Sequence, residues 1–380
     1  MNRYRALFPV TSEYAYMDNA AAGPPSTRVI EAVHSFLTKR SQLGSLYMDD
    51  ARAMCERTRT KVATLIGASA EEIAYTKNTP DGLNIIANGL RWSRGDNVVT
   101  TDIEFPANIY PWMNLRDFGV ELKFVRSQNG VVDPDDVIAA IDDRTRLVAL
   151  SWVEFHGGHR NDLKKIGAVC RARDVFLCVD AIQGVGVVRC DVRAMNVDFL
   201  AFSSQKWLLA PHGVGILYVR RELIDRLRVA AAGQTSVQLG ANYLDYKLEF
   251  KSGALRFEPG YINQVGISGL EASIDLFNEA GTAAIEEYIL GITRHLRSGL
   301  KDLGCSVLGS EADQDRAGVV SFQHSRVAAR DINAELRKAK VVVSEREGFI
   351  RVSPHFYNTT EEIDQLLRVV ASKTAAPAAA

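Results

Sequence analysis

The sequence lacks most of the marks of secreted, membrane and metal-binding proteins. Its 380 residues include only five cysteines, none in CxxC spacing, which argues against a disulfide framework or a zinc site. The seven histidines form no HExxH motif. No run of about 18 apolar residues occurs, and the first residues lack the long apolar core of a signal peptide. We therefore expect a cytoplasmic protein with no metal ion and no membrane contact.

An excess of charge of either sign is also missing. The chain has 45 basic and 46 acidic residues and a formal net charge of -1. This balance offers no electrostatic footprint for nucleic acid, so we expect a small molecule rather than nucleic acid as the partner. With 47% hydrophobic residues, the chain is long enough for a large core and for two domains.

The middle of the chain alternates short apolar runs with helical patterns. Continuous rather than alternating apolar runs, separated by helices, are typical of a mainly parallel sheet that is covered on both faces. We therefore predict a large α/β domain with a mainly parallel seven-stranded sheet. The seven predicted strands are residues 72–76, 97–102, 121–125, 146–153, 175–181, 199–204 and 215–219.

The pattern changes after about residue 260. Residues 282–304 carry isoleucine and leucine at three- and four-residue steps, which predicts a long amphipathic helix. Short strands and two further helices follow, which indicates a smaller C-terminal α+β domain. We predict an N-terminal segment that contributes to the small domain, a large domain, the small domain and a flexible tail, at residues 1–15, 16–260, 261–373 and 374–380.

Polar residues follow several of the predicted strands directly. Ligands of open α/β sheets bind beyond the carboxyl ends of the strands, so these side chains are expected to meet in one crevice. Each has a simpler explanation by itself, such as a helix cap or a solvated lysine. Together they offer what pyridoxal 5'-phosphate (PLP) requires: a lysine for a Schiff base, a carboxylate for the pyridinium nitrogen, and a helix N-terminus with hydroxyls for the phosphate. They are Asn78, Thr79, Glu104 to Asn108, Glu154, Asp180, Gln183 and Ser203 to Lys206.

Ordered motifs along almost the whole chain resemble the class V aminotransferase-like family of fold-type I PLP enzymes. This family includes cysteine desulfurases, isopenicillin N epimerases and kynureninases. The resemblance implies a fold-type I transferase fold, PLP as cofactor, an amino-acid substrate, and a homodimer with its active sites at the interface. The motifs are YMDNAAAGPPS, EFPANIYPW, SWVEFHGGHRNDL, VDAIQGVG, SSQKWLLAPHGVGILYV, LRFEPGYIN and IRVSPHFYNT.

The same motifs imply roles for individual residues. Lys206 would form the Schiff base and move the proton at the substrate α-carbon, and Asp180 would pair with the pyridinium nitrogen. The other implied cofactor contacts are Gln183 at the phenolic oxygen, Asn78, Thr79 and Ser203 at the phosphate, Phe105 stacked on the ring, Gln205 beside Lys206, and Tyr261 reaching the neighbouring subunit's phosphate. The implied substrate-binding residues are Arg351, Glu154 and Asn19.

The sequence also departs from the family pattern. Gln205 and Phe105 stand where desulfurases usually carry histidine, and Pro80 replaces a phosphate-site threonine. Many relatives carry a neutral residue at the position of Glu154. Desulfurases bear a persulfide-forming cysteine just before the stretch that aligns with IRVSPHFYNT, whereas the corresponding KVVVSEREGFIRVS contains none.

The missing cysteine favours a C–S β-lyase or a related elimination, which needs no enzyme thiol. Three alternatives stay open: an aminotransferase, an amino-acid epimerase, and a non-catalytic PLP-binding regulator. An epimerase needs a second acid on the opposite face of the substrate, for which Glu154, His156 and Tyr47 are candidates.

Overall fold

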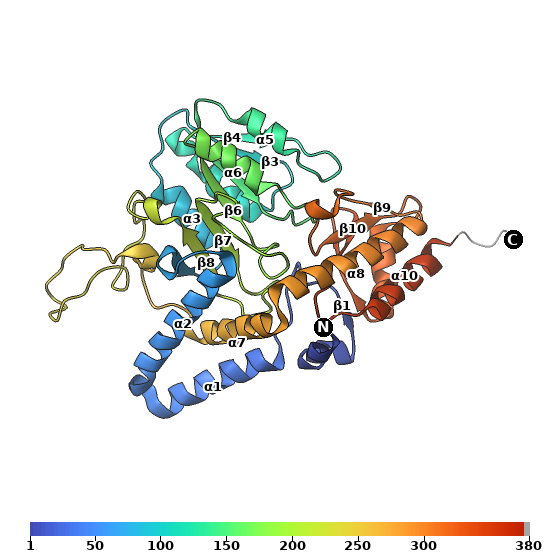
Figure 1. Cartoon of the computed structure of the whole chain (residues 1–380), viewed down its shortest axis with the longest axis horizontal. Coiled ribbons are helices and arrows are strands. Elements are labelled where there is room, and N and C mark those ends of the chain that lie inside the picture. The colour runs from blue at the N-terminus through green and yellow to red at the C-terminus, as the bar shows by residue number, and fades with distance from the viewer. Residues whose placement is uncertain (376–380) are drawn as a thin grey trace.

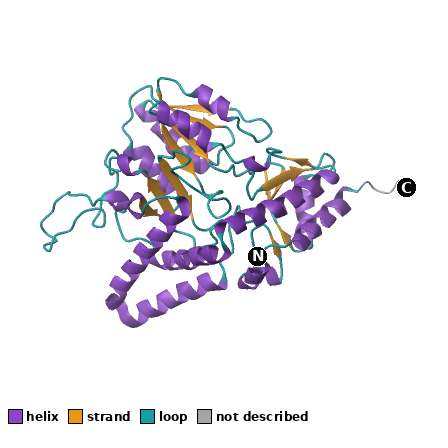
Figure 2. Cartoon of the chain, viewed as in Figure 1, coloured by secondary structure: helices purple, strands orange, loops and turns teal. Residues whose placement is uncertain are grey.

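The computed structural model describes residues 1–375 of the chain. Figure 1 shows a large part built on a central sheet and a smaller part at the C-terminal end, joined by the long helix α8 (Thr282–Asp302). Figure 2 shows that helices flank the strands in both parts. The fold is α/β with a seven-stranded sheet, as the sequence predicts.

The large sheet has the strand order β2-β8-β7-β6-β5-β3-β4. The pairs β2–β8 and β8–β7 are antiparallel, and the other four pairs are parallel. All seven strands lie within a few residues of the predicted ones. They are β2 (Ile73–Thr76), β3 (Asn97–Thr101), β4 (Glu121–Val125), β5 (Thr145–Ser151), β6 (Phe176–Asp180), β7 (Phe199–Ser203) and β8 (Gly215–Val219).

The central strands β6 and β7 are buried at every position and are apolar up to their last residue, because both faces of the sheet are covered. In β6, Leu177 and Val179 pack into one hydrophobic cluster, while Phe176 and Cys178 pack into another on the opposite face. The edge strand β4 exposes Glu121, a charge that opposes pairing with another chain. Helices α3 (Thr79–Gly89), α4 (Tyr110–Met113), α5 (Pro134–Ala140) and α6 (Leu163–Ala172) connect these strands.

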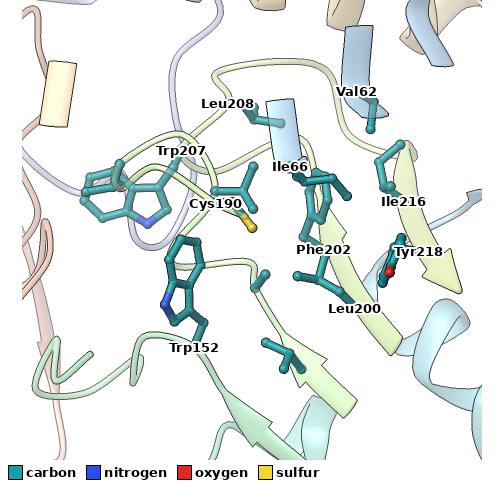
Figure 3. Close-up of a cluster of buried hydrophobic side chains, with 14 of the residues drawn as sticks. Val62, Ile66, Trp152, Cys190, Leu200, Phe202, Trp207, Leu208, Ile216 and Tyr218 are labelled. Atoms are coloured by element: carbon teal, nitrogen blue, oxygen red, sulfur yellow. The ribbon is translucent and has the colours of Figure 1, made fainter. Parts of the chain in front are cut away.

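The larger cluster joins the sheet to helices from both ends of the large domain. Figure 3 shows Val62 and Ile66 of α2 (Met48–Ile66) beside Phe202 of β7 and Ile216 of β8. Ser26 caps α1 (Thr27–Leu43), its hydroxyl accepting a hydrogen bond from the Val29 amide. Helix α7 (Gln264–Ala280) contacts α1 and α2.

The small domain consists of a four-stranded sheet with helices on one side. The strand order is β12-β13-β10-β9, and every pair is antiparallel. The N-terminal strand β1 (Ala15–Tyr16) pairs with β11 (Val341–Val342), and Ala15 joins the small domain's core. The remaining elements are β9 (Ser306–Val307), β10 (Val320–Gln323), α9 (Ala329–Lys338), β12 (Ser344–Arg346), β13 (Phe349–Val352) and α10 (Thr360–Thr374).

Buried side chains of α7, such as Ile267 and Leu270, belong to the large domain's core, whereas Ile292 and Leu296 of α8 belong to the small one. We therefore propose that the small domain begins within α8 rather than at residue 261. Thr374 ends α10, and residues 376–380 of the predicted tail lie outside the described residues. Among residues 1–375, no helix combines the length and apolar character needed to cross a membrane.

Candidate active site

The candidate site lies where β5, β6 and β7 end. Asp180 is the last residue of β6 and pairs in register with Ser151, the last residue of β5. Ser203 ends β7, and Lys206 follows three residues later. Because these three strands are parallel, their carboxyl ends meet at one edge of the sheet, where α/β proteins bind ligands.

Lys206 is half-buried in the turn after β7. Burial lowers the pKa of its amine to about 8, although the charge of Asp180 acts in the opposite direction. The Nζ atom lies 5.5 Å from the ring centroid of Phe105. The lysine backbone is also held, because an ideal Cβ on Gly23 would lie 2.1 Å from the Lys206 carbonyl oxygen. Lys206 therefore has a closely packed backbone and an amine with an unprotonated fraction near neutral pH.

Asp180 is a buried carboxyl group. Burial raises its pKa to about 6, while a hydrogen bond from the Ile182 amide (2.9 Å) and the charge of Lys206 favour the ionised form. Within residues 1–375, no basic side chain approaches Asp180 to within 4.0 Å. A ring cation such as a protonated pyridine nitrogen suits a buried acid of this kind.

Two hydroxyls meet at the N-terminus of α3. The Ser203 hydroxyl accepts a hydrogen bond from the Thr79 amide (2.7 Å) and lies 2.9 Å from the Thr79 hydroxyl. Asn78 is the N-cap residue, and its side-chain oxygen accepts a hydrogen bond from the Asp81 amide. The helix end and its hydroxyls can hold a phosphate. Pro80 contributes no amide donor there.

Hydrogen bonds at both the nitrogen and the oxygen of its amide orient the side chain of Gln183. Its Nε2 donates to the Ala20 carbonyl (3.1 Å), and its Oε1 accepts from the Trp207 indole (2.6 Å). His355 in turn contacts the Trp207 carbonyl through Nε2 (2.9 Å). One N–H of Gln183 is thus left to bind an oxygen atom of a ligand. No sequence pattern indicated that Trp207 and His355 support this amide, beyond the position of Trp207 next to Lys206.

Arg351 is a buried guanidinium with incomplete pairing. It is 3% exposed, and burial lowers its pKa to about 10. It donates to the Phe155 carbonyl (3.1 Å) and to the Ser344 hydroxyl (3.3 Å), and Asp18 lies 3.7 Å away. Its Nε has no partner among the described residues. A guanidinium with free donors can bind a carboxylate.

A buried hydrogen-bonded network connects Glu104 to Glu154. The Ser151 hydroxyl donates to Glu104 (2.6 Å), and Asn161 donates both to the Ser151 carbonyl and to Glu154 Oε1 (2.8 Å each). Burial raises the pKa of Glu104 to about 7 and that of Glu154 well above its usual value. The sequence indicated Glu104 as a strand-end residue and as part of the EFPANIYPW motif, and it gave Ser151 and Asn161 of the SWVEFHGGHRNDL motif no role.

Other predicted residues lie in different surroundings. Asn19 is fully buried, donating to the Ser353 carbonyl and accepting from the Tyr357 hydroxyl (2.8 Å each). Tyr47 packs on Phe36, with ring centroids 5.4 Å apart.

Tyr261 and Gln205 also differ from the central residues. Tyr261 is 78% exposed and lines a cavity of about 760 Å³ together with Lys77 and Asp81. Gln205 is half-buried, and its carbonyl accepts a hydrogen bond from the Gly23 amide (2.8 Å). The exposure of Tyr261 leaves its ring available to another chain.

The residues present fit PLP. The site combines a lysine of lowered pKa, a buried acid without a cationic side-chain partner, a helix N-terminus with two hydroxyls, and an amide with a free donor. Described residues 1–375 contain no group of three or more His, Cys, Asp or Glu arranged to hold a metal ion. The donor set therefore suits an organic phosphate with a basic ring.

Comparisons with known proteins agree with this chemistry. The family model for aminotransferase class V matches residues 15–366. A probable cysteine desulfurase of Methanothermobacter thermautotrophicus is 32% identical and covers 95% of each chain. A mutant of C-DES with glycine covalently linked to its PLP cofactor has a TM-score of 0.91 at 26% identity, over 97% of this chain and 98% of that one.

A complex of the cystine C–S lyase C-DES with cysteine persulfide has a TM-score of 0.90 at 26% identity, over 96% of this chain and 99% of that one. The family match covers nearly the whole chain, and the expected fold and family are confirmed. This chain belongs to the aminotransferase class V family of PLP-dependent enzymes.

Proposed function

We propose that this chain is a PLP-dependent C–S β-lyase that acts on a cysteine-derived amino acid without an enzyme thiol. Its relatives include cysteine desulfurases, and a structurally similar protein is a cystine C–S lyase. Both chemistries begin at the α-carbon of a sulfur-containing amino acid. They differ in whether a cysteine of the enzyme takes up the sulfur.

The observation that carries the proposal is that the cysteines are buried, with raised thiol pKa values. All five are free and buried. Burial raises the thiol pKa of Cys55 and Cys170 to about 12 and that of Cys305 to about 11. A persulfide-forming cysteine needs an accessible thiolate.

The cysteine-bearing loop expected of a desulfurase is replaced by a tight hairpin. Strands β12 and β13 are joined by Glu347 and Gly348 alone. This hairpin contains no cysteine.

PLP, when bound, supplies an electron sink for the carbanion at the substrate α-carbon. Asp180 would hold the proton on the ring nitrogen, and the Lys206 amine would take the α-proton. An amine with a pKa of about 8 suits this task, because general bases work best near the operating pH. Arg351 would bind the substrate carboxylate with its guanidinium, whose pairing within the chain is incomplete.

Three further residues would orient the cofactor. Thr79 and Ser203 would bind its phosphate, and Gln183 would donate to its phenolic oxygen. The overall reaction consumes one water and converts the cysteine conjugate to pyruvate, ammonium and a free thiol. The C–S bond breaks with its electron pair on sulfur, so no oxidant or reductant is needed.

The test is a product analysis of the PLP-loaded enzyme with cysteine, cystine and cysteine S-conjugates. We expect pyruvate and thiol in equal amounts from at least one of these substrates, and neither product from Lys206→Ala. Alanine with released sulfur would instead identify a desulfurase. Accumulation of the pyridoxamine form would identify an aminotransferase, and α-hydrogen exchange without either product an epimerase. Each of these three outcomes contradicts the proposal.

We also propose a homodimer in the cytoplasm. The exposure of Tyr261 supports the dimer, as does the loop between β8 and α7, which projects from the body in Figure 1 and exposes Tyr243, Leu244 and Tyr246. Five free cysteines support a reducing compartment. Sedimentation should give twice the chain mass, and Tyr261→Ala mixed with Lys206→Ala should partly restore activity if Tyr261 serves the partner's site.

A further inference from the structure

A row of four aromatic rings leads away from Lys206. Phe105, over which the lysine Nζ lies, packs edge-on against Phe155 with centroids 5.2 Å apart. Phe155 lies 5.9 Å from His156, and His156 packs edge-on against Phe349 at 5.1 Å. We call Phe105, Phe155, His156 and Phe349 the aromatic row.

The aromatic row is assembled from three separate segments that meet at the site. Phe105 follows β3, Phe155 and His156 follow β5, and Phe349 begins β13 of the small domain. Phe105 is 42% exposed, and the other three rings are half-buried. Scattered exposed aromatics are ordinary, but a continuous row beside a reactive lysine is typical of a ligand site.

Arg351 places the expected carboxylate site next to the aromatic row. Its Nη1 donates to the carbonyl of Phe155, in the middle of the row. An amino acid with its carboxylate on Arg351 and its α-carbon near Lys206 would therefore lie between two points that both adjoin the row.

The β12–β13 hairpin holds the far end of the row in place. Glu347 and Gly348 both have positive φ, 49° and 80°, as a two-residue hairpin turn requires. This turn pairs Phe349 with Arg346 in register. The ring of Phe349 therefore stands on a short rigid hairpin, at the position where a desulfurase carries its mobile cysteine loop.

We propose that Phe155, His156 and Phe349, the part of the aromatic row beyond the cofactor-stacking Phe105, form the subsite for the substrate side chain and select cysteine derivatives whose sulfur carries an aromatic or other bulky apolar group. This inference rests on the proposed function of the site. Burial of an apolar substrate group against these apolar rings contributes favourable binding free energy, and contacts between aromatic rings contribute more. Burial lowers the pKa of His156, so its imidazole is neutral at pH 7 and adds no charge to the row.

The experiment measures binding to the PLP-loaded enzyme without turnover. Homophenylalanine has the shape of S-phenylcysteine with a methylene in place of sulfur, so it cannot lose a thiol. Binding of homophenylalanine and of alanine is followed by the change in cofactor absorbance at equilibrium. We expect homophenylalanine to bind at least about tenfold more tightly than alanine, which corresponds to about 1.4 kcal/mol.

Substitutions at Phe349 test whether this ring gives the preference for homophenylalanine over alanine. Phe349→Ser should lower the ratio of the two affinities at least about threefold, while alanine affinity and the resting cofactor spectrum stay unchanged. Phe349→Leu, which keeps an apolar side chain on the hairpin, should lower it less. Phe118→Ser is the matched control, because Phe118 is 60% exposed on the helical turn Asn114–Phe118 and lies outside the row.

Equal binding of homophenylalanine and alanine would overturn the subsite while leaving the proposed function intact. Tighter binding of glutamate, a diacid with no sulfur leaving group, than of homophenylalanine, lost in Arg346→Gln, would also overturn the subsite and indicate a charged substrate side chain instead. If no amino acid changed the cofactor absorbance, the proposed function itself would fail, and the subsite with it.

Discussion

The indole Nε1 of Trp207 donates a 2.6 Å hydrogen bond to the side-chain oxygen of Gln183, and both residues are fully buried. The bond fixes which end of the amide is free for a ligand. Trp207 directly follows Lys206 in the chain, so the same turn presents the amine and orients the amide.

Trp207→Phe removes this donor and leaves a buried carbonyl oxygen without a partner. We expect a loss of about 1–3 kcal/mol in the free energy of unfolding, measured by denaturant titration. We also expect PLP affinity to fall by about tenfold, because Gln183 can then rotate. Trp92→Phe is the control, since the Trp92 indole donates a comparable bond (2.7 Å) to the Ala87 carbonyl. An equal loss of PLP affinity in both variants would contradict the orienting role.

The lowered pKa of Lys206 predicts how cofactor loading depends on pH. Attack on the PLP aldehyde requires the unprotonated amine, whose fraction in the folded chain rises as the pH passes through about 8. Stopped-flow absorbance of the apoenzyme mixed with PLP should show the loading rate rising from pH 7 to pH 9 and then levelling. A rate that kept rising to pH 10 or above would indicate a lysine of ordinary pKa.

His355 predicts an acid-dependent loss of stability. Its Nδ1 accepts from the Phe356 amide and its Nε2 contacts the Trp207 carbonyl, so the folded chain holds a neutral ring and burial lowers the pKa to about 4. Since the unfolded chain protonates this histidine near its ordinary pKa of about 6.5, the folded state loses stability as the pH falls from about 6.5 to about 4. The loss should approach about 3 kcal/mol and then level.

Urea unfolding of wild type and His355→Asn across this pH range measures the effect. The variant should be less stable at pH 7 but should depend less on pH between 6.5 and 4. His34→Asn, at a position outside the core, should follow the wild-type profile. If the His355 variant kept the wild-type slope, another group would be responsible for the acid sensitivity.

The close contact of Gly23 with Lys206 indicates that the N-terminal segment packs tightly against the turn that carries this lysine. A Cβ at this position would lie 2.1 Å from the Lys206 carbonyl oxygen and 2.5 Å from the Leu209 side chain. Gly23→Ala should therefore cost about 1–3 kcal/mol in unfolding free energy and weaken PLP binding.

Gly291→Ala is the matched control for this substitution. Gly291 lies inside α8, and a Cβ at this position would meet nothing within 4 Å. The substitution should stabilise the chain by about 0.5–1 kcal/mol, because alanine favours helices over glycine. Unchanged PLP binding in Gly23→Ala would show that the turn can shift without moving the amine.

Much of the fold could be predicted because strands and helices form according to the pattern of apolar residues within each short segment. The strand Phe199–Ser203 is apolar up to its last residue, as is typical of a strand covered on both faces, and this pattern is visible in the sequence. Asp180 and Lys206 could likewise be named as candidates, since residues at the carboxyl ends of parallel strands are brought to one edge by the topology alone. The domain boundary at residue 261 stays a prediction, because the amphipathic pattern of α7 does not say which core its apolar face enters.

The sequence by itself determined the sheet, the order of the chemical groups and the family to which the chain belongs. Only the tertiary structure decided which neighbours orient those groups. Trp207 meets His355 across 148 residues, and His156 meets Phe349 from another domain. Such contacts depend on how separate elements pack, and packing follows from shape complementarity across the whole core rather than from any local pattern of residues.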